Sequence, residues 1–146
     1  MGQILSIDYG KARTGIAVTD DMQIIASGLT TVETPKLMDF LKKYFSENQV
    51  DEIVIGLPTD LKGNMSDIET VIQKFISSFE KDFPDKKINR LDERFTSKMA
   101  SFFISQSGKN KKQRQEKGLI DKVSATILLQ NFLDQKRWFY QLEPLA

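Results

Sequence analysis

A continuous apolar run in the middle of the chain constrains the fold more than any other feature. It extends from Ile53 to Leu57 and stops at Pro58. An uninterrupted apolar run of this length is typical of a strand in a parallel sheet, where helices cover both faces. Apolar residues at helical spacing flank the run, over residues 37–45 and 68–79. The sequence therefore predicts helix–strand crossovers in an α/β domain.

Three shorter runs of β-type residues precede the first of these helices. They cover residues 4–7, 14–19 and 24–32, and β-branched side chains dominate the third. The first two runs are close enough to pair as a hairpin that turns through residues 9–13. The N-terminal part of the chain therefore predicts a three-stranded meander.

The rest of the chain continues the alternation of strands and helices. A short strand is predicted over residues 87–91, and helices are predicted near residues 97–105 and 119–134. The predicted order is β-β-β-α-β-α-β-α-α. Three meandering strands followed by crossovers predict one domain over residues 1–146, with a mixed five-stranded sheet and helices on both faces. This is the layout of a ribonuclease-H-like fold.

Two helix starts carry local capping signals. Thr34 precedes Pro35, which predicts an N-cap followed by proline at the first helical position. Ser66 and Glu69 have the spacing of a capping box, in which each side chain bonds to the backbone of the other residue.

The 146 residues include no cysteine and no histidine. Disulfides, a thiolate nucleophile, a Ser-His-Asp triad and zinc sites built from Cys or His are therefore excluded. Catalysis would depend on carboxylates, hydroxyls, lysines or a bound hard cation. No apolar run approaches the roughly 20 residues that a membrane span needs, and the N-terminus lacks the basic start of a signal peptide. We therefore expect a soluble cytoplasmic protein.

Charge is distributed unevenly along the chain. Residues 1–93 contain 11 basic and 16 acidic residues, a net charge of −5, whereas residues 94–146 contain 10 and 4, a net charge of +6. This asymmetry suggests that one face meets a polyanion, and ordinary scatter of surface charge is the alternative. The composition of residues 107–118 predicts a mobile basic loop. This loop either contacts a nucleic-acid backbone or only makes the protein more soluble. Its candidate phosphate contacts are Lys109, Lys111, Lys112, Arg114 and Lys117.

Three acidic residues lie near the ends of predicted strands or the start of a predicted helix, and the binding and active sites of open α/β sheets lie beyond the carboxyl ends of the strands. Asp8 ends the first strand, Glu93 follows the fifth, and Asp121 lies near the start of the last helix. Carboxylates that converge without a cation repel one another. Ligand sets made only of oxygen favour Mg²⁺ or Mn²⁺ over zinc. The three acids therefore predict a divalent-cation site able to hydrolyse a phosphodiester.

Each of these features also has an ordinary structural explanation. Asp8 suits a turn, Glu93 a solvated charge run, and Asp121 the positive end of a helix dipole. The glycine-bearing turn after Asp8 offers backbone N–H groups to a phosphate, or is a tight hairpin that needs a positive φ at Gly10. The hypothesis depends on the combination of signals rather than on any one of them.

The sequence resembles the YqgF-type, RuvX-like Holliday junction resolvases, also described as nucleases that mature the small-subunit ribosomal RNA precursor. The resemblance spans Ile4 to about Asp134. Four segments carry it: IDYGKARTGIA at residues 7–17, IGLP at 55–58, LDERFTS at 91–97 and IDKVSATILLQ at 120–130.

The resemblance implies a ribonuclease-H-like fold and nuclease activity. The family's catalytic acids correspond to Asp8, Glu93 and Asp121, and two of its arginines correspond to Arg13 and Arg94. Both four-way DNA junctions and ribosomal RNA precursors are proposed as substrates of the family, so the resemblance leaves the nucleic acid open.

Three positions depart from the family pattern. Ala12 precedes the first arginine, Ser97 stands where a second threonine is common, and Ser124 stands where the last motif commonly has alanine. None of these changes removes a carboxylate.

The main hypothesis is a nuclease that uses Mg²⁺ or Mn²⁺ and acts on structured RNA or branched DNA, as a monomer or a homodimer. One alternative is a small nucleotide-binding module, because actin-like and sugar-kinase folds share a similar first hairpin. Another is a non-catalytic RNA-binding factor in which the basic half of the chain does the binding.

Overall fold

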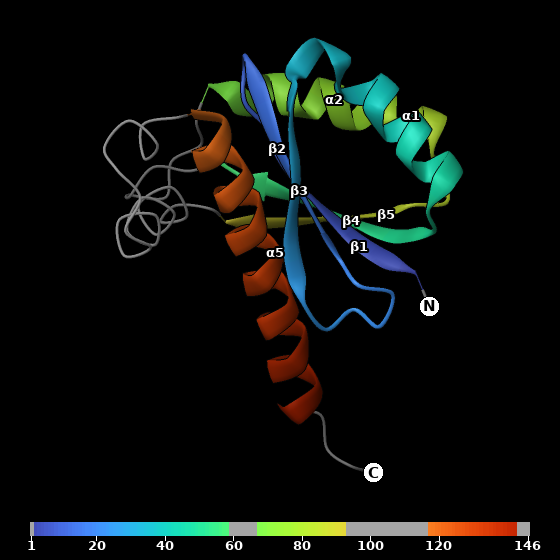
Figure 1. Cartoon of the computed structure of the whole chain (residues 1–146), viewed down its shortest axis with the longest axis vertical. Coiled ribbons are helices and arrows are strands. Elements are labelled where there is room, and N and C mark those ends of the chain that lie inside the picture. Colours follow the sequence, from blue (N-terminus) through green and yellow to red (C-terminus); the bar gives the residue numbers. More distant parts are fainter. Residues whose placement is uncertain (1, 59–66, 93–116, 143–146) are drawn as a thin grey trace.

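The computed structural model describes residues 2–58, 67–92 and 117–142, and within the last range the side chains of residues 122–136. Figure 1 shows a twisted sheet with helices on both sides. The elements are β1 (Gln3–Asp8), β2 (Arg13–Thr19), β3 (Ala26–Glu33), a short 3₁₀ helix (Thr34–Lys36), α1 (Leu37–Glu47), β4 (Val50–Leu57), α2 (Ile68–Asp82), β5 (Lys87–Asp92) and α5 (Lys117–Leu142).

The five strands form one mixed sheet in the order β3-β2-β1-β4-β5. β1 pairs with β2 and β2 with β3 in antiparallel fashion, whereas β1, β4 and β5 are parallel. The predicted mixed five-stranded sheet is confirmed. Because β1, β4 and β5 are parallel, their carboxyl ends meet at one edge of the sheet.

Helices α1 and α2 cover one face of the sheet and bury the larger part of the core. Alternate residues of β1, such as Leu5 and Ile7, point into this layer together with Ile53 and Ile55 of β4. Phenylalanines of α1 and of α2 with its C-cap close it, and the rings of Phe45 and the C-cap Phe83 lie edge to face at 4.9 Å.

Helix α5 covers the other face and packs mainly on β2, β3 and β1. Ile4, Ala17 and Val54 of the sheet form a second core with small and aliphatic residues of the helix. The helix residues of this core are Ala125, Leu128, Leu129 and Leu133.

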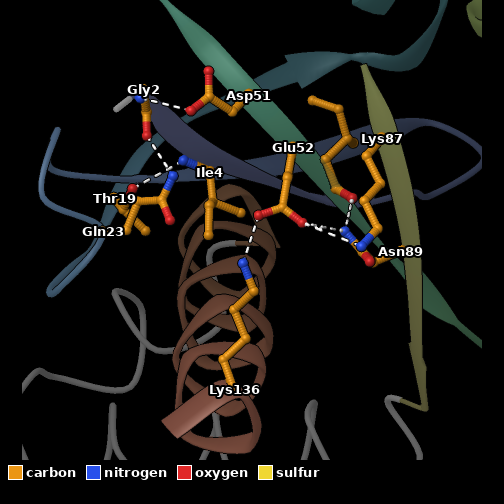
Figure 2. A network of polar contacts seen from close by, with 10 residues as sticks. Gly2, Ile4, Thr19, Gln23, Asp51, Glu52, Lys87, Asn89 and Lys136 are labelled. Atoms are coloured by element: carbon orange, nitrogen blue, oxygen red, sulfur yellow. Dashed lines mark hydrogen bonds and ion pairs between the residues drawn. The ribbon is translucent and has the colours of Figure 1, made fainter. Parts of the chain in front are cut away.

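Two polar contacts attach α5 to the central strands β1 and β4. The buried Ser6 hydroxyl donates to the Ala125 carbonyl at 2.7 Å. Nearer the other end of α5, the Lys136 ammonium bonds Glu52 at 2.5 Å, beside Ile4 in the strand register (Figure 2). Ala125 therefore lies beside Ser6, and the later Lys136 lies near the earlier Ile4. Helix α5 and strand β1 thus run in opposite directions.

A glycine brings the edge strand β3 close to α5. A Cβ atom at Gly28 would lie 2.9 Å from the Lys122 Cγ and 3.0 Å from the Thr126 Oγ1. Both contacts are closer than ordinary van der Waals contact, so a side chain at this position would displace the side chains of Lys122 and Thr126.

The predicted third strand begins too early. Ile24 and Ile25 belong to the loop before β3, because the Asp20 carboxylate accepts hydrogen bonds from their backbone N–H groups at 2.8 and 2.9 Å. These bonds also lower the pKa of Asp20 below its ordinary value. A side chain thus takes the donors that a longer β-ladder would use.

The predicted N-cap at Thr34 is wrong. Thr34 begins the 3₁₀ helix and makes no cap, since Glu33 precedes it and α1 starts only at Leu37. Its hydroxyl instead donates to the Gly10 carbonyl at 2.6 Å, and its N–H donates to the Ala12 carbonyl at 3.0 Å. Thr34 therefore fastens the turn between β1 and β2.

The last helix is longer than predicted, because it begins at Lys117 and continues to Leu142. Lys117 and Gly118, predicted as the end of the basic loop, are its first two residues. The rest of that loop and the predicted helix near residues 97–105 lie outside the described residues. Among the residues that the structure does describe, no helix is both long and apolar enough to cross a membrane.

Candidate active site

Asp8 is the last residue of β1 and lies at the sheet edge where β4 and β5 also end. It is half-buried and stands directly across from Gly15 of β2. On its other side, the register that pairs Ile7 with Ile55 brings Asp8 level with Gly56 of β4. Because both neighbours are glycines, neither adjacent strand places a Cβ atom directly beside Asp8.

Helix α5 approaches the same edge, and it covers the face of the sheet toward which the Asp8 side chain projects. Side chains alternate along a strand, so Ser6 and Asp8 both project toward α5. The Ser6 hydroxyl reaches the Ala125 carbonyl, and Asp121 lies one helical turn before Ala125. Two strand residues span about 6.6 Å and one helical turn about 5.4 Å. The turn of α5 that carries Asp121 therefore lies beside the end of β1.

Small residues of α5 permit this close approach. Ser124 and Ala125 are buried against the sheet, one turn after Asp121. A larger side chain at either position would hold the helix farther from β1. The departure from the common alanine at Ser124 leaves a residue that is still small enough for this packing.

The residue that follows Asp8 anchors the strand end to the opposite layer. The Tyr9 ring packs against Phe75 of α2 with ring centroids 5.4 Å apart. Burial also raises the pKa of the Tyr9 phenol above its ordinary value. The two neighbours of Asp8, Ile7 and Tyr9, therefore both pack in the layer of α1 and α2.

Gly10 is required in the next turn by close approach of the backbone. A Cβ atom there would lie 2.3 Å from the Arg13 carbonyl oxygen. The φ angle of Gly10 is outside the left-handed region, so the positive φ predicted for a tight hairpin is wrong. Arg13 starts β2 opposite Glu33 and is partly buried. By strand alternation it shares the α5 face with Gly15, diagonal to Asp8.

The remaining predicted site residues are only partly covered by the structure. Glu93 lies outside the described residues, directly after Asp92, which ends β5 at the site edge. Lys117 and Asp121 belong to the described backbone of α5. The other predicted phosphate contacts outside the described residues are Arg94, Lys109, Lys111, Lys112 and Arg114. Among the side chains that are described, no three carboxylates gather into a metal-binding group.

A basic residue that the sequence did not single out lies at the same edge. The Arg90 guanidinium of β5 donates to both oxygens of Glu69, at 2.7 and 2.9 Å. It also donates to the carbonyls of Ile55 at 3.2 Å and Gly56 at 2.9 Å. We call this group, Arg90 with Glu69 and the two carbonyls, the Arg90 clamp. No local pattern in the sequence signals it, because its partners are distant in the chain.

The clamp also changes the interpretation of Glu69. Its carboxylate was predicted to cap α2, but it accepts from Arg90 and from Gln73 at 2.6 Å. The Arg90 hydrogen bond holds the pKa of Glu69 below its ordinary value. The pair is only 21% and 13% exposed, for Arg90 and Glu69 respectively, so solvent screens it weakly.

The donor chemistry of the edge fits a hard divalent cation. The chain has no histidine or cysteine, so any ligands here are oxygens. Asp8 supplies a half-buried carboxylate at a strand end, and the α5 turn that contains Asp121 lies beside it. Oxygen donors of this kind suit Mg²⁺ or Mn²⁺.

Comparison with known proteins identifies the family. A family model described as "RuvX: Holliday junction resolvase" matches residues 2–135. A protein of Flavobacterium johnsoniae is 57% identical over 138 residues, which cover 94% of this chain and 100% of the relative. Relatives in Flavobacterium psychrophilum and Bacteroides fragilis are 52% and 47% identical, covering 93% and 94% of this chain and 99% of each relative. All three are named "Putative pre-16S rRNA nuclease".

The match extends through every strand and most of α5. It confirms the resemblance found in the sequence, together with the ribonuclease-H-like fold and the nuclease class that the resemblance implied. The chain belongs to the RuvX family of Holliday junction resolvases.

Proposed function

We propose that this protein is a cytoplasmic, metal-dependent nuclease that trims the precursor of 16S ribosomal RNA. The convergence of β1 and α5 carries the proposal, since the Ser6–Ala125 hydrogen bond brings the Asp121 turn beside Asp8. The names of the close relatives support RNA over a four-way DNA junction. Maturing one RNA end needs one active site, so we propose that a monomer suffices.

Asp8, Asp121 and Glu93 would hold Mg²⁺ or Mn²⁺. When bound, such ions lower the pKa of water and stabilise charge on the leaving oxygen of a phosphodiester. Asp8 and Asp121 would orient the ligand oxygens from two rigid elements, β1 and α5. Glu93, directly after β5, would complete the set or orient the attacking water.

Cationic side chains around this edge would bind the RNA backbone. Arg13 starts β2 on the same face as Asp8 and is partly buried, so its guanidinium would make a positioned phosphate contact. Arg94 and the basic residues of 109–117 would extend this surface. Such contacts predict that RNA affinity falls steeply with salt.

The test is cleavage of labelled 16S precursor RNA and of a four-way DNA junction, side by side, with Mn²⁺ or with chelator. We expect metal-dependent cleavage of the RNA, lost by orders of magnitude in Asp8→Asn without loss of folding. Asp39→Asn is the matched control, because Asp39 is an exposed carboxylate in the first turn of α1. Salt-sensitive binding without cleavage in any divalent metal would instead favour the non-catalytic RNA-binding alternative.

A further inference from the structure

Among the described residues near the candidate site, Arg90 makes the most extensive set of polar contacts, yet it faces away from Asp8. Alternation along β5 places Ile88 and Arg90 on the α2 face, and Ile88 packs into that core layer. Leu91 packs on the α5 layer instead. Arg90 therefore lies on the reverse face of the sheet from the α5 layer, so a direct contact with RNA or with a cation beside Asp8 is not expected.

The Arg90 clamp is nonetheless level with the candidate site. In the parallel register Arg90 pairs with Ile55, and Ile55 pairs with Ile7. The next step along β4 is Gly56, whose carbonyl accepts from Arg90 and which is level with Asp8. The clamp thus bonds the backbone of β4, the neighbour of β1, at the position that is level with Asp8.

Three elements meet at this guanidinium. Glu69 belongs to the first turn of α2, the two carbonyls belong to the end of β4, and Arg90 itself lies two residues before the end of β5. A flat guanidinium offers five N–H groups in a rigid fork, which lets one side chain bond several acceptors in fixed directions. Lysine has the charge but not the fork, so it would hold fewer of these acceptors.

Removing the guanidinium would affect more than one bond. The Glu69 carboxylate would stay mostly buried without its cation, and two backbone carbonyls would lose a donor. The carboxyl ends of β4 and β5 would then be free to shift against α2. β4 adjoins β1 beside Asp8, so a shift of the end of β4 would move the Asp8 carboxylate.

We propose that the Arg90 clamp sets the geometry of the divalent-cation site from the reverse face of the sheet. Arg90 is a positioning residue in this scheme and touches neither the cation nor the RNA. The proposal rests on the proposed function, because it concerns the same site. It predicts that metal affinity depends on Arg90 while RNA affinity does not.

The test measures Mn²⁺ binding by electron paramagnetic resonance, without RNA, in the wild type, Arg90→Lys and Glu69→Gln. We expect the Mn²⁺ dissociation constant to rise about tenfold in both variants, the lower end of the range for residues that orient metal ligands. RNA affinity in chelator should remain at the wild-type value. Glu69→Gln keeps the shape of the side chain, so it provides the answer if the Arg90 variant does not fold.

Tyr44→Phe is the control for stability alone. Its hydroxyl donates to Gln3 at 2.6 Å, at the opposite end of β1 from Asp8. It should lose stability and keep the wild-type Mn²⁺ affinity. If Arg90→Lys and Glu69→Gln lose stability but also keep that affinity, the clamp is only structural and the inference is overturned. A wild type that neither binds Mn²⁺ nor cleaves would overturn the proposed function itself, which distinguishes the two failures.

Discussion

The Ser6→Ala variant should separate the contribution of one buried hydrogen bond from the rest of the α5 packing. Ser6 is fully buried, and its hydroxyl is the donor that meets the Ala125 carbonyl at 2.7 Å. Alanine removes one oxygen and leaves an acceptor of α5 without this donor. The Ala125 carbonyl keeps its intrahelical hydrogen bond, so the variant loses only the net contribution of one buried hydrogen bond, about 0.5–1.5 kcal/mol, and we expect the free energy of unfolding to fall by about 1 kcal/mol. For a domain of this size the melting temperature should drop by roughly 4 °C.

Ser46→Ala is the matched control for Ser6→Ala, measured by urea unfolding under the same conditions. The Ser46 hydroxyl also donates to a backbone carbonyl, that of Lys43 at 2.6 Å, but on the exposed surface of α1. Water replaces the lost bond there, so the change should stay within about 0.5 kcal/mol. Equal losses in the two variants would refute the claim that burial gives the Ser6 bond its importance for seating α5.

Three further perturbations test other contacts of the fold. Glu69→Gln should flatten the pH dependence of stability in acid. The pKa of Glu69 is lower in the folded state than in the unfolded state. Its contribution to stability is therefore present above the unfolded-state pKa and is lost as pH falls through the folded-state pKa. Urea midpoints between neutral pH and about pH 3 measure this, and parallel curves for wild type and variant would contradict it. Gly28→Val should cost about 1–3 kcal/mol, because the new side chain would crowd the side chains of Lys122 and Thr126. Urea unfolding measures this loss, and an unchanged midpoint would show that α5 does not pack on β3 as described. Lys136→Met should cost about 1.5 kcal/mol, because the mostly buried Glu52 loses its closest cation, and thermal melts at low and high salt check this.

The sheet and its two helix layers were predictable because each depends on a repeating local pattern. The apolar run of β4 and the helical spacing in α1 and α2 follow from burial on one or two faces, which the sequence records directly. The positions of the three acids beyond the strand ends predicted the site, and the family resemblance indicated the same three residues. The structure places Asp8 and the Asp121 turn at one edge, while the role of these residues remains a prediction.

Two of the errors arose where a distant partner outweighs a local preference. Thr34 has the sequence of an N-cap, but the carbonyl of Gly10 takes its hydroxyl. Glu69 has the spacing of a capping box, but Arg90 lies against it from β5. In both cases the competing partner is more than 20 residues away in the chain, so no local pattern predicts the exchange. Such contacts depend on how the elements pack.

Backbone amide signals in the presence of Mn²⁺ test the central claim most directly. A paramagnetic ion held at the proposed site broadens nearby amides and spares distant ones. We predict that substoichiometric Mn²⁺ broadens residues 6–9 and 120–125 together, although they are more than 100 positions apart, and leaves Gly2 and Lys136 sharp. Broadening confined to another acidic segment, such as Asp20 and Asp21, with the ends of β1 and α5 unaffected, would contradict a cation site between these two elements.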